Sequence, residues 1–231
     1  MNIKDAVVLI TGANRGIGLE FARAALARGA RKVYATARDP ESIPLEGVIK
    51  LKLDVTCAED VARIAQQCPD VTLLINNAGL HMGEIARGFA GLGLAKWQHF
   101  FAVNTFGPLL LAEALRPALK AAKGLIINKS SMASYQPQTA YGITKASLNI
   151  FTHAMAAQFE GKDAMISALQ RLQQITHGGG VLKVQRLGGG LHLGGEALLQ
   201  VGALPAQEIG SLVGEFRRVF LRDQADAGRS A

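Results

Sequence analysis

Cysteines, aromatic residues and long apolar runs are all scarce in this sequence, and each scarcity argues against a class of protein. There are two cysteines, Cys57 and Cys68, with neither a CxxC spacing nor a Cys/His cluster. We therefore expect no metal site and no disulfide, but two reduced thiols in a cytoplasmic protein. No apolar run approaches the roughly 20 residues that a transmembrane helix needs. The first apolar stretch, residues 6–10, lacks a signal-peptide cleavage pattern and is expected to be a strand.

The charge balance is basic, with 25 Lys and Arg against 18 Asp and Glu and a formal net charge of +7. These basic residues are scattered, and no aromatic residues are interleaved with them for base stacking, so we expect no nucleic-acid partner. A basic balance also suits a protein that holds a polyanionic dinucleotide, and we favour that interpretation.

The first 150 residues alternate short apolar runs with longer helical patterns. This alternation is typical of βαβ units and predicts an α/β fold with a doubly wound parallel sheet, the Rossmann fold. Strands are predicted at residues 6–11, 32–37, 48–53, 72–76 and 124–128, and helices at 17–28, 58–67, 95–122 and 141–159. The length of 231 residues suits a single domain.

The C-terminal part has a different composition. Residues 171–231 hold 12 of the 26 glycines, which weakens both helix and strand patterns. Only residues 207–221 resemble an amphipathic helix. We therefore divide the chain into a dinucleotide-binding and catalytic core, 1–169, and a divergent glycine-rich segment, 170–231, that is poorly specified.

A glycine motif, TGANRGIG, follows the first predicted strand and opens the first helix. Its glycines suit a tight turn, a close backbone approach to a diphosphate and close packing of helix on sheet, and the helix N-terminus favours phosphate. We expect a dinucleotide to bind this motif through Gly12, Asn14, Arg15, Gly16, Ile17 and Gly18.

The end of the second predicted strand discriminates between the two nicotinamide cofactors. There the sequence reads Ala37-Arg38-Asp39. Arg38, joined by Arg15, would pair with a 2′-phosphate, so NADP(H) is favoured over NAD(H). The alternative is a solvated arginine beside a turn.

Two further strand ends are predicted to contact the cofactor. Asp54, followed by Val55, either accepts a hydrogen bond from the adenine amino group, caps the following helix with Thr56, or does both. The fourth strand ends in Asn-Asn-Ala-Gly, where an ordinary Asx turn explains one asparagine but not all four residues. We expect this second segment to contact the cofactor through Asn77, Ala78 and Gly79.

Together, TGANRGIG, NNAG and YGITK (Tyr141 to Lys145) resemble the short-chain dehydrogenase/reductase family over residues 1 to about 160. The segment ATARDP and the short loop before the tyrosine resemble its C-factor-like and carbonyl-reductase-like branches. The resemblance implies an NADP-dependent oxidoreductase that interconverts a carbonyl and an alcohol, with Asn104, Ser131, Tyr141 and Lys145 as catalytic residues.

Chemistry supports these roles. Reduction of a carbonyl leaves an alkoxide that needs a proton from a positioned acid. Tyr141 and Lys145 lie four residues apart, hence on one helix face, and a nearby ammonium favours the tyrosinate. The resemblance also places both residues at the nicotinamide ribose. Ser131 would polarise the carbonyl, and Asn104 would hold a water that relays protons from the lysine.

Alternatives remain at two of these positions. The interval from Ser131 to Tyr141 is shorter than is common in the family, so either the loop is shortened or Ser130 or Ser134 takes the role. Asn104 is alternatively a structural hydrogen-bonding residue near the Gly107–Pro108 kink. The five histidines match no catalytic motif and are expected at the surface or in packing.

After residue 169 the family's Pro-Gly lid segment is missing. Either a divergent lobe closes the site, or the reading frame shifts near that residue. A nucleotide-binding signalling or scaffold protein with lost or impaired catalysis is therefore the rival to the enzyme. The expected partner is a small carbonyl or alcohol substrate, and no membrane partner is expected.

A homo-oligomer would form through the helices carrying Asn104 and Tyr141. The residues that could form this contact, or could instead belong to the core, are Leu109, Leu110, Leu111, Leu148 and Phe151.

Overall fold

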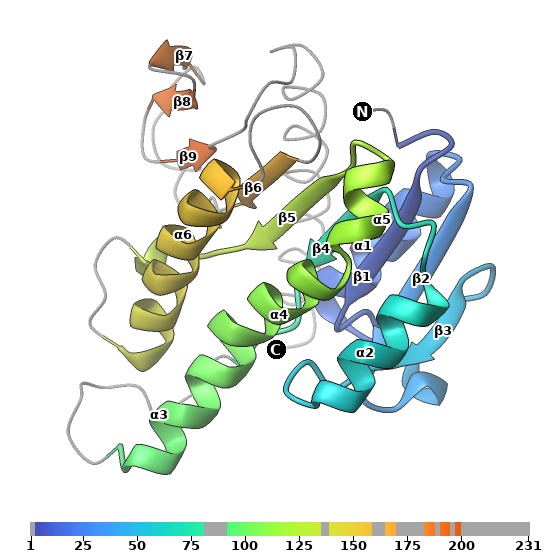
Figure 1. The fold of residues 1–231 in the computed structure, drawn as a ribbon, viewed down its shortest axis with the longest axis horizontal. Coiled ribbons are helices and arrows are strands. Elements are labelled where there is room, and N and C mark those ends of the chain that lie inside the picture. Colours follow the sequence, from blue (N-terminus) through green and yellow to red (C-terminus); the bar gives the residue numbers. More distant parts are fainter. Residues whose placement is uncertain are drawn as a thin grey trace, which may run out of the picture.

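Six parallel strands form the central sheet in the computed structural model (Figure 1). The structure describes residues 3–80, 92–134, 139–158, 165–169, 183–187, 190–194 and 197–199. The strands are β1 (Val7–Thr11), β2 (Lys32–Ala37), β3 (Ile49–Lys52), β4 (Leu73–Asn76), β5 (Leu125–Lys129) and β6 (Met165–Leu169). Their order, β3-β2-β1-β4-β5-β6, reverses between β1 and β4. This order confirms the predicted doubly wound Rossmann fold.

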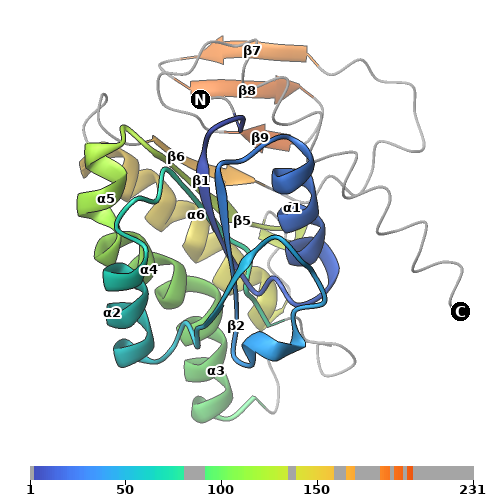
Figure 2. The same cartoon turned by 90° about the vertical axis from the view of Figure 1, so that its right-hand side faces the viewer.

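Helices cover both faces of this sheet (Figure 2). One face packs against α1 (Gly16–Ala27). The other is covered by α2 (Ala58–Gln67), α4 (Gly107–Ala114), α5 (Arg116–Ala121) and α6 (Ala140–Gln158). Side chains of β1 alternate between two apolar cores: Val7 and Leu9 lie on the α2 side, whereas Val8 and Ile10 lie on the α1 side. Burial on both faces explains the continuously apolar strand sequences.

The predicted boundaries of most elements are confirmed to within one residue. This holds for all five predicted strands and for the helices α1, α2 and α6. The fold class therefore follows from hydrophobic periodicity and glycine placement.

The single helix predicted for residues 95–122 is wrong in its continuity. The structure divides it into α3 (Leu94–Phe101), a π-helical turn (Ala102–Phe106), α4 and α5. Two prolines account for the division, because a proline lacks the N–H that would bond the carbonyl four residues earlier. At Pro108 the carbonyl of Asn104, within the π turn, has no N–H partner four residues on. At Pro117 the same is true of the carbonyl of Glu113, beside the break between α4 and α5.

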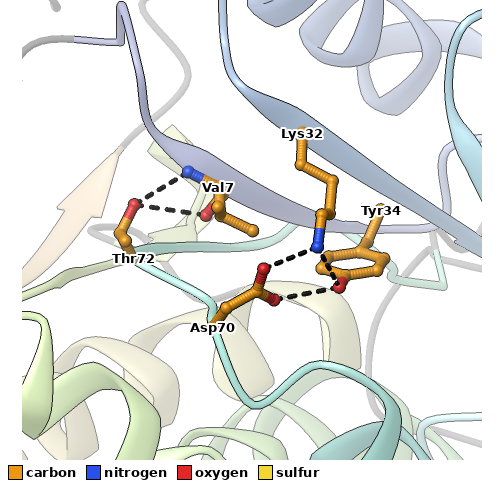
Figure 3. Close-up of polar contacts among 5 residues, drawn as sticks. All are labelled: Val7, Lys32, Tyr34, Asp70 and Thr72. Atoms are coloured by element: carbon orange, nitrogen blue, oxygen red, sulfur yellow. Dashed lines mark hydrogen bonds and ion pairs between the residues drawn. The ribbon is translucent and has the colours of Figure 1, made fainter.

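A cluster of polar side chains ties the amino ends of three strands together (Figure 3). Asp70, before β4, accepts hydrogen bonds from Lys32 Nζ at 2.6 Å and from the Tyr34 hydroxyl at 2.9 Å. Burial raises the pKa of Tyr34, which keeps its phenol protonated and able to donate. Beside it, Thr72 Oγ1 accepts a 3.0 Å bond from the Val7 N–H. The cluster lies at the amino ends of the strands, opposite the ends where the glycine motif follows β1.

Three short strands lie in the C-terminal segment: β7 (Lys183–Leu187), β8 (Gly190–Gly194) and β9 (Ala197–Leu199) form an antiparallel sheet. β9 lies beside β6. The glycine run that weakened the strand pattern thus contains β8, because pairing on both sides outweighs low intrinsic propensity. The amphipathic helix predicted at residues 207–221 lies outside the described residues, as does most of 170–231.

Candidate active site

A cleft of about 660 Å³ follows the carboxyl edge of the sheet, where the strand order reverses. Ligands of open α/β sheets bind at this position. Its lining includes, from the predicted cofactor set, Gly12, Asn14, Arg15, Gly16, Ile17, Gly18, Arg38, Asp54, Val55, Asn77, Ala78 and Gly79. Tertiary structure thus brings together four segments that lie up to 67 residues apart in the sequence (12 to 79).

The glycine loop has the shape that a diphosphate requires. Gly12 and Gly16 have φ values of +65° and +54°, a left-handed region that glycine adopts readily. A methyl group added to Gly18 would lie 2.1 Å from the carbonyl oxygen of Gly12 and 2.4 Å from Nδ2 of Asn77. By contrast, a methyl group on Gly16 would meet nothing within 4 Å. Gly18 therefore allows the start of α1 to pack directly on Gly12 and Asn77, while the space beside Gly16 stays open.

The amino end of α1 is available to an anion. Its N-cap residue, Arg15, makes no side-chain capping hydrogen bond, and the first turn contains no acidic residue. The first N–H groups of a helix lack partners within the helix and carry partial positive charge. The chain's own residues therefore fit the diphosphate of a dinucleotide at this point.

Asn77 braces this loop against the end of β4. Its Nδ2 donates to the carbonyl oxygens of Thr11 at 2.9 Å and Gly12 at 3.1 Å. The Thr11 hydroxyl oxygen in turn accepts the N–H groups of Asn77 and Ala78, at 3.0 and 2.9 Å. Asn77 Oδ1 is buried without a hydrogen-bond partner among the described residues. The asparagine segment thus holds the ends of β1 and β4 together, a structural role that the sequence did not indicate.

Arg38 and Asp39 have different surroundings at the end of β2. The Asp39 side chain accepts a 3.1 Å bond from the Glu41 N–H and caps a short 3₁₀ helix, Pro40–Ser42. Its carbonyl oxygen accepts a 2.5 Å bond from the Ser42 hydroxyl. Arg38 is exposed and lines the cleft. Both residues line the cleft, but the Asp39 carboxylate is engaged in this local cap.

Asp54 forms a turn at the end of β3. Its Oδ1 accepts both the N–H and the hydroxyl of Thr56, at 2.9 and 2.6 Å. These hydrogen bonds, the hydroxyl bond foremost, lower the pKa of the Asp54 carboxyl. α2 begins later, at Ala58, with Cys57 as its N-cap. Of the alternatives for Asp54, the helix cap is replaced by an Asx turn ahead of the helix, and a contact to the cofactor stays a prediction.

The side chains of Asn104 and Lys145 both lie close to Gly79. A methyl group on Gly79 would lie 3.1 Å from Asn104 Oδ1 and 3.6 Å from Lys145 Nζ, so only glycine fits comfortably between them. Asn104 is fully buried in the π-helical turn. Its Oδ1 accepts the Leu80 N–H at 2.8 Å, and its Nδ2 donates to the Leu80 carbonyl oxygen at 3.0 Å and to Thr144 Oγ1 at 3.1 Å. Asn104 thus has a structural hydrogen-bonding role joining α6 to the chain after β4.

Lys145 is buried in the first turns of α6, with 1% of its surface exposed. Its Nζ donates a 2.9 Å hydrogen bond to the carbonyl oxygen of Lys129. Burial, together with the nearby charge of Lys129, lowers the pKa of Lys145 to about 7. Burial thus favours the neutral amine, whereas a charged ammonium was expected from the sequence.

Tyr141 lies one turn before Lys145 on α6, as its spacing predicted. Lys145 Nζ is 5.9 Å from the centroid of the Tyr141 ring. The tyrosine is partly exposed, and its carbonyl oxygen accepts a 2.8 Å bond from the Thr144 hydroxyl. A cation at this distance acts on the phenol through space.

Three serines follow β5, and two of them are occupied structurally. Ser130 donates to the Lys145 carbonyl oxygen at 3.4 Å. Ser134 donates to the Ser131 carbonyl oxygen at 2.6 Å and accepts from Asn149 Nδ2 at 3.0 Å. The Ser131 hydroxyl accepts a 3.3 Å bond from the Ala133 N–H. Of these three hydroxyls, that of Ser131 alone donates no hydrogen bond to another described residue.

Several lining residues were missed by the sequence analysis: Ala37, Asp39, Ser42, Leu53, Leu80, His99, Val103 and Lys129. Most are neighbours of predicted residues and could have been found by extending each motif by one position. His99 is exposed, in agreement with the expected surface position, and it also lies in the cleft wall. The helical spacing between His99 and Val103 was the available signal.

Three further observations concern the leucines proposed for an interface, the cysteines and the helix lengths. Leu111 and Leu148 are buried, at 0% and 2% exposure, so these candidate interface residues belong to the core. Cys57 and Cys68 are free cysteines. Within the described residues, no helix is long and apolar enough to cross a membrane.

Comparison with known proteins agrees with this geometry. Residues 6–170 match the family model described as short chain dehydrogenase. A serine 3-dehydrogenase of Agrobacterium fabrum is 29% identical over 179 residues, which cover 72% of this chain and 71% of the relative. A galactitol 2-dehydrogenase (L-tagatose-forming) of Cereibacter sphaeroides is 34% identical over 184 residues, which cover 72% and 70%.

Solved structures place the fold in the same group. A short chain dehydrogenase from Burkholderia cenocepacia in complex with NADP has a TM-score of 0.67 and 34% identity, covering 74% of this chain and 72% of that one. An NADPH-bound carbonyl reductase from chicken fatty liver has a TM-score of 0.64 and 28% identity, with 71% and 75% covered. The chain therefore belongs to the short-chain dehydrogenase/reductase family and is an NAD(P)-dependent oxidoreductase acting on carbonyl and alcohol groups.

Proposed function

We propose that this protein reduces a small carbonyl substrate reversibly with NADPH, with Tyr141 as the general acid and base. The observation that carries the proposal is the position of Lys145 Nζ and Asn104 Oδ1 close to Gly79, a residue that lines the cleft. The described core, within residues 1–169, contains all of these residues. Residues 170–231 would form a separate, divergent segment.

The preference for NADPH over NADH is supported by the charges at the end of β2. Asp39 would repel a 2′-phosphate, but its carboxylate caps the Pro40–Ser42 turn. Arg38 faces the cleft and Arg15 lies in the glycine loop, so two guanidinium groups are available for the phosphate.

The remaining predicted cofactor residues would hold the rest of the dinucleotide. Asp54 and Val55 would contact the adenine, and both carboxylate contacts to Thr56 fall on Oδ1, which leaves Oδ2 for the adenine amino group. The main chain at Ala78 and Gly79 would border the nicotinamide half. Hydride transfer to the carbonyl carbon is the chemistry that the bound nicotinamide supplies.

The side chains of this protein would handle the proton. Ser131 would donate a hydrogen bond to the substrate oxygen and stabilise the charge that develops there. Tyr141 would give its hydroxyl proton to that oxygen and regain it from solvent. Lys145 would favour the tyrosinate electrostatically, and an anionic dinucleotide beside its amine would raise the fraction that is charged. Asn104 would position the chain around Lys145.

A homodimer through α4 and α6 is supported by exposed apolar side chains on these helices. Leu110 is 54% exposed and Ile150 is 70% exposed, with Phe106 beside them at 44%. Such large apolar side chains gathered on a surface are typical of a protein interface.

The function is tested by mixing the protein with NADPH and a panel of aldehydes and ketones. Absorbance of the reduced nicotinamide should fall with at least one carbonyl, and Tyr141→Phe should abolish that fall while NADPH still binds. Binding of NADPH without turnover across a broad panel would instead favour the rival, a nucleotide-binding protein without catalysis.

A further inference from the structure

His99 belongs to a row of residues that leads from the end of β3 to the outer rim of the cleft. His99 and Val103 both line the cleft and lie four residues apart. Four residues further along, Gly107 packs on Val55: a methyl group there would lie 2.9 Å from Val55 Cγ2. Residues at this spacing share one side of a helix, so His99 lies on the side of the helix that faces Val55.

A different side of the same helix faces α6. Asn104, which follows Val103, bonds Thr144 of α6, and its Oδ1 and Lys145 Nζ both lie close to Gly79. The row of His99 thus leads to Val55, whereas the position after Val103 leads to α6. Since the row of His99 lies on the Val55 side, His99 borders the part of the cleft that is proposed to hold the adenine rather than the nicotinamide.

The His99 side chain is not committed to the core. None of the eight residues of α3, all of which the structure describes, is buried, and His99 itself is exposed. In the cleft wall its neighbour along the row is the apolar side chain of Val103. An imidazole ring at this position extends an apolar wall outward with a flat aromatic surface, on which a purine can stack.

We propose that the His99 ring packs against the adenine ring of the bound dinucleotide and is a positioning residue for that half of the cofactor. This inference rests on the proposed function, because it requires a dinucleotide in the cleft. Stacking of a base on an aromatic side chain is strong enough that its loss should weaken binding about tenfold. The nicotinamide half should be unaffected.

The test is isothermal titration calorimetry of the full-length protein with three probes: NADPH, 2′-phospho-ADP-ribose and nicotinamide mononucleotide. His99→Ala should weaken binding of the first two about tenfold and leave the third unchanged. His99→Phe should restore the affinity, because it keeps a flat ring and removes the ring nitrogens. The matched control is Gln98→Ala, an exposed neighbour on the same turn that is absent from the cleft lining.

The outcomes separate this contact from the function on which it rests. A wild-type protein that does not bind NADPH would refute the proposed function. Wild-type binding of NADPH that His99→Ala leaves unchanged would overturn only the contact with adenine. The contact is also overturned if His99→Phe binds as weakly as His99→Ala, or if both fragments lose affinity equally. Thermal unfolding midpoints equal to that of Gln98→Ala would establish that the variants remain folded.

Discussion

Lys145 and Lys129 are joined by a 2.9 Å hydrogen bond from the buried amine of the first to the carbonyl oxygen of the second. The bond links α6 to the end of β5, so this helix is held on the sheet by the same side chain that is proposed to act on Tyr141. A single backbone acceptor does not compensate a buried ammonium for lost hydration. The protein therefore carries an electrostatic strain at its candidate active site, and that strain can be measured.

The stability of the cofactor-free protein should rise with pH above neutrality. Lys145 has a pKa of about 7 in the folded protein, against an ordinary value of 10.5. Between these values the unfolded chain holds a proton that the folded protein has released, so the free energy of unfolding increases with pH, by at most about 1.4 kcal/mol per pH unit. Urea unfolding at pH 7, 8 and 9 should show this rise, and Lys145→Met should reduce the slope. Lys96→Met, at an exposed position of α3, should keep it; equal slopes in both variants would contradict the assignment.

Gly18→Ala should damage both stability and dinucleotide binding. Its methyl group would be placed 2.1 Å from the Gly12 carbonyl oxygen, and relief of that contact requires backbone movement in the glycine loop. We expect a loss of about 1–3 kcal/mol in the free energy of unfolding and loss of NADPH binding, measured by denaturant titration and fluorescence. Gly93→Ala is the control, since a methyl group there meets nothing within 4 Å. A Gly18→Ala variant as stable as this control would refute the packing argument.

Arg38→Ala should change the preference between cofactors. Removal of a charge-assisted hydrogen bond to the 2′-phosphate costs about 1.5–3 kcal/mol, or roughly ten- to a hundredfold in the dissociation constant for NADPH. NADH lacks that phosphate, so its binding should be nearly unchanged. Arg31→Ala removes the same charge at the opposite end of β2, where the residue is also exposed. An equal loss for NADPH in both variants would mean that Arg38 acts only through net charge.

Asp60→Asn should lower stability at neutral pH more than at acidic pH. Asp60 is 5% exposed, accepts the Asp54 N–H at 2.8 Å and forms an ion pair with Arg63. The backbone hydrogen bond from Asp54 is the main cause that lowers the pKa of the Asp60 carboxyl. The stabilisation is therefore complete above the ordinary aspartate pKa of 3.8 and is lost as pH falls through the lower value of the folded protein.

The loss at pH 7 should be about 1–3 kcal/mol, because the neutral amide ends the ion pair with Arg63 and weakens the charge-assisted hydrogen bond from the Asp54 N–H. Thermal unfolding at pH 7 and pH 3 measures it. Glu59→Gln is the matched control, because it neutralises the adjacent carboxylate, which is exposed. A difference between Asp60→Asn and the wild type that is the same at both pH values would contradict the role of the ionised carboxylate.

Local pattern was sufficient for the elements and for the family. Continuous apolar runs ending in glycine motifs placed the strands and α1, α2 and α6 to within one residue, because strand burial and helix periodicity are properties of neighbouring residues. The long helix was predicted as one element, although Pro108 and Pro117 each remove a hydrogen bond from the preceding turn.

The candidate site could be predicted as a set of residues but not as a set of contacts. TGANRGIG and NNAG were both assigned to the cofactor, yet the bond from Asn77 to the Gly12 carbonyl oxygen crosses 65 residues and has no local signature. His99 was likewise dismissed because no motif surrounds it. Its place in the cleft depends on how the helix packs on Val55.

The amino-acid order alone determined a doubly wound sheet, a dinucleotide loop and a tyrosine one helical turn from a lysine, since each depends on spacing over a few residues. The tertiary structure decided the burial of Lys145, the hydrogen-bond partners of the three serines and the capping role of Asp39. These depend on burial and on partners from distant segments, because electrostatic and hydrogen-bonding free energies are set by the surroundings of a group in space.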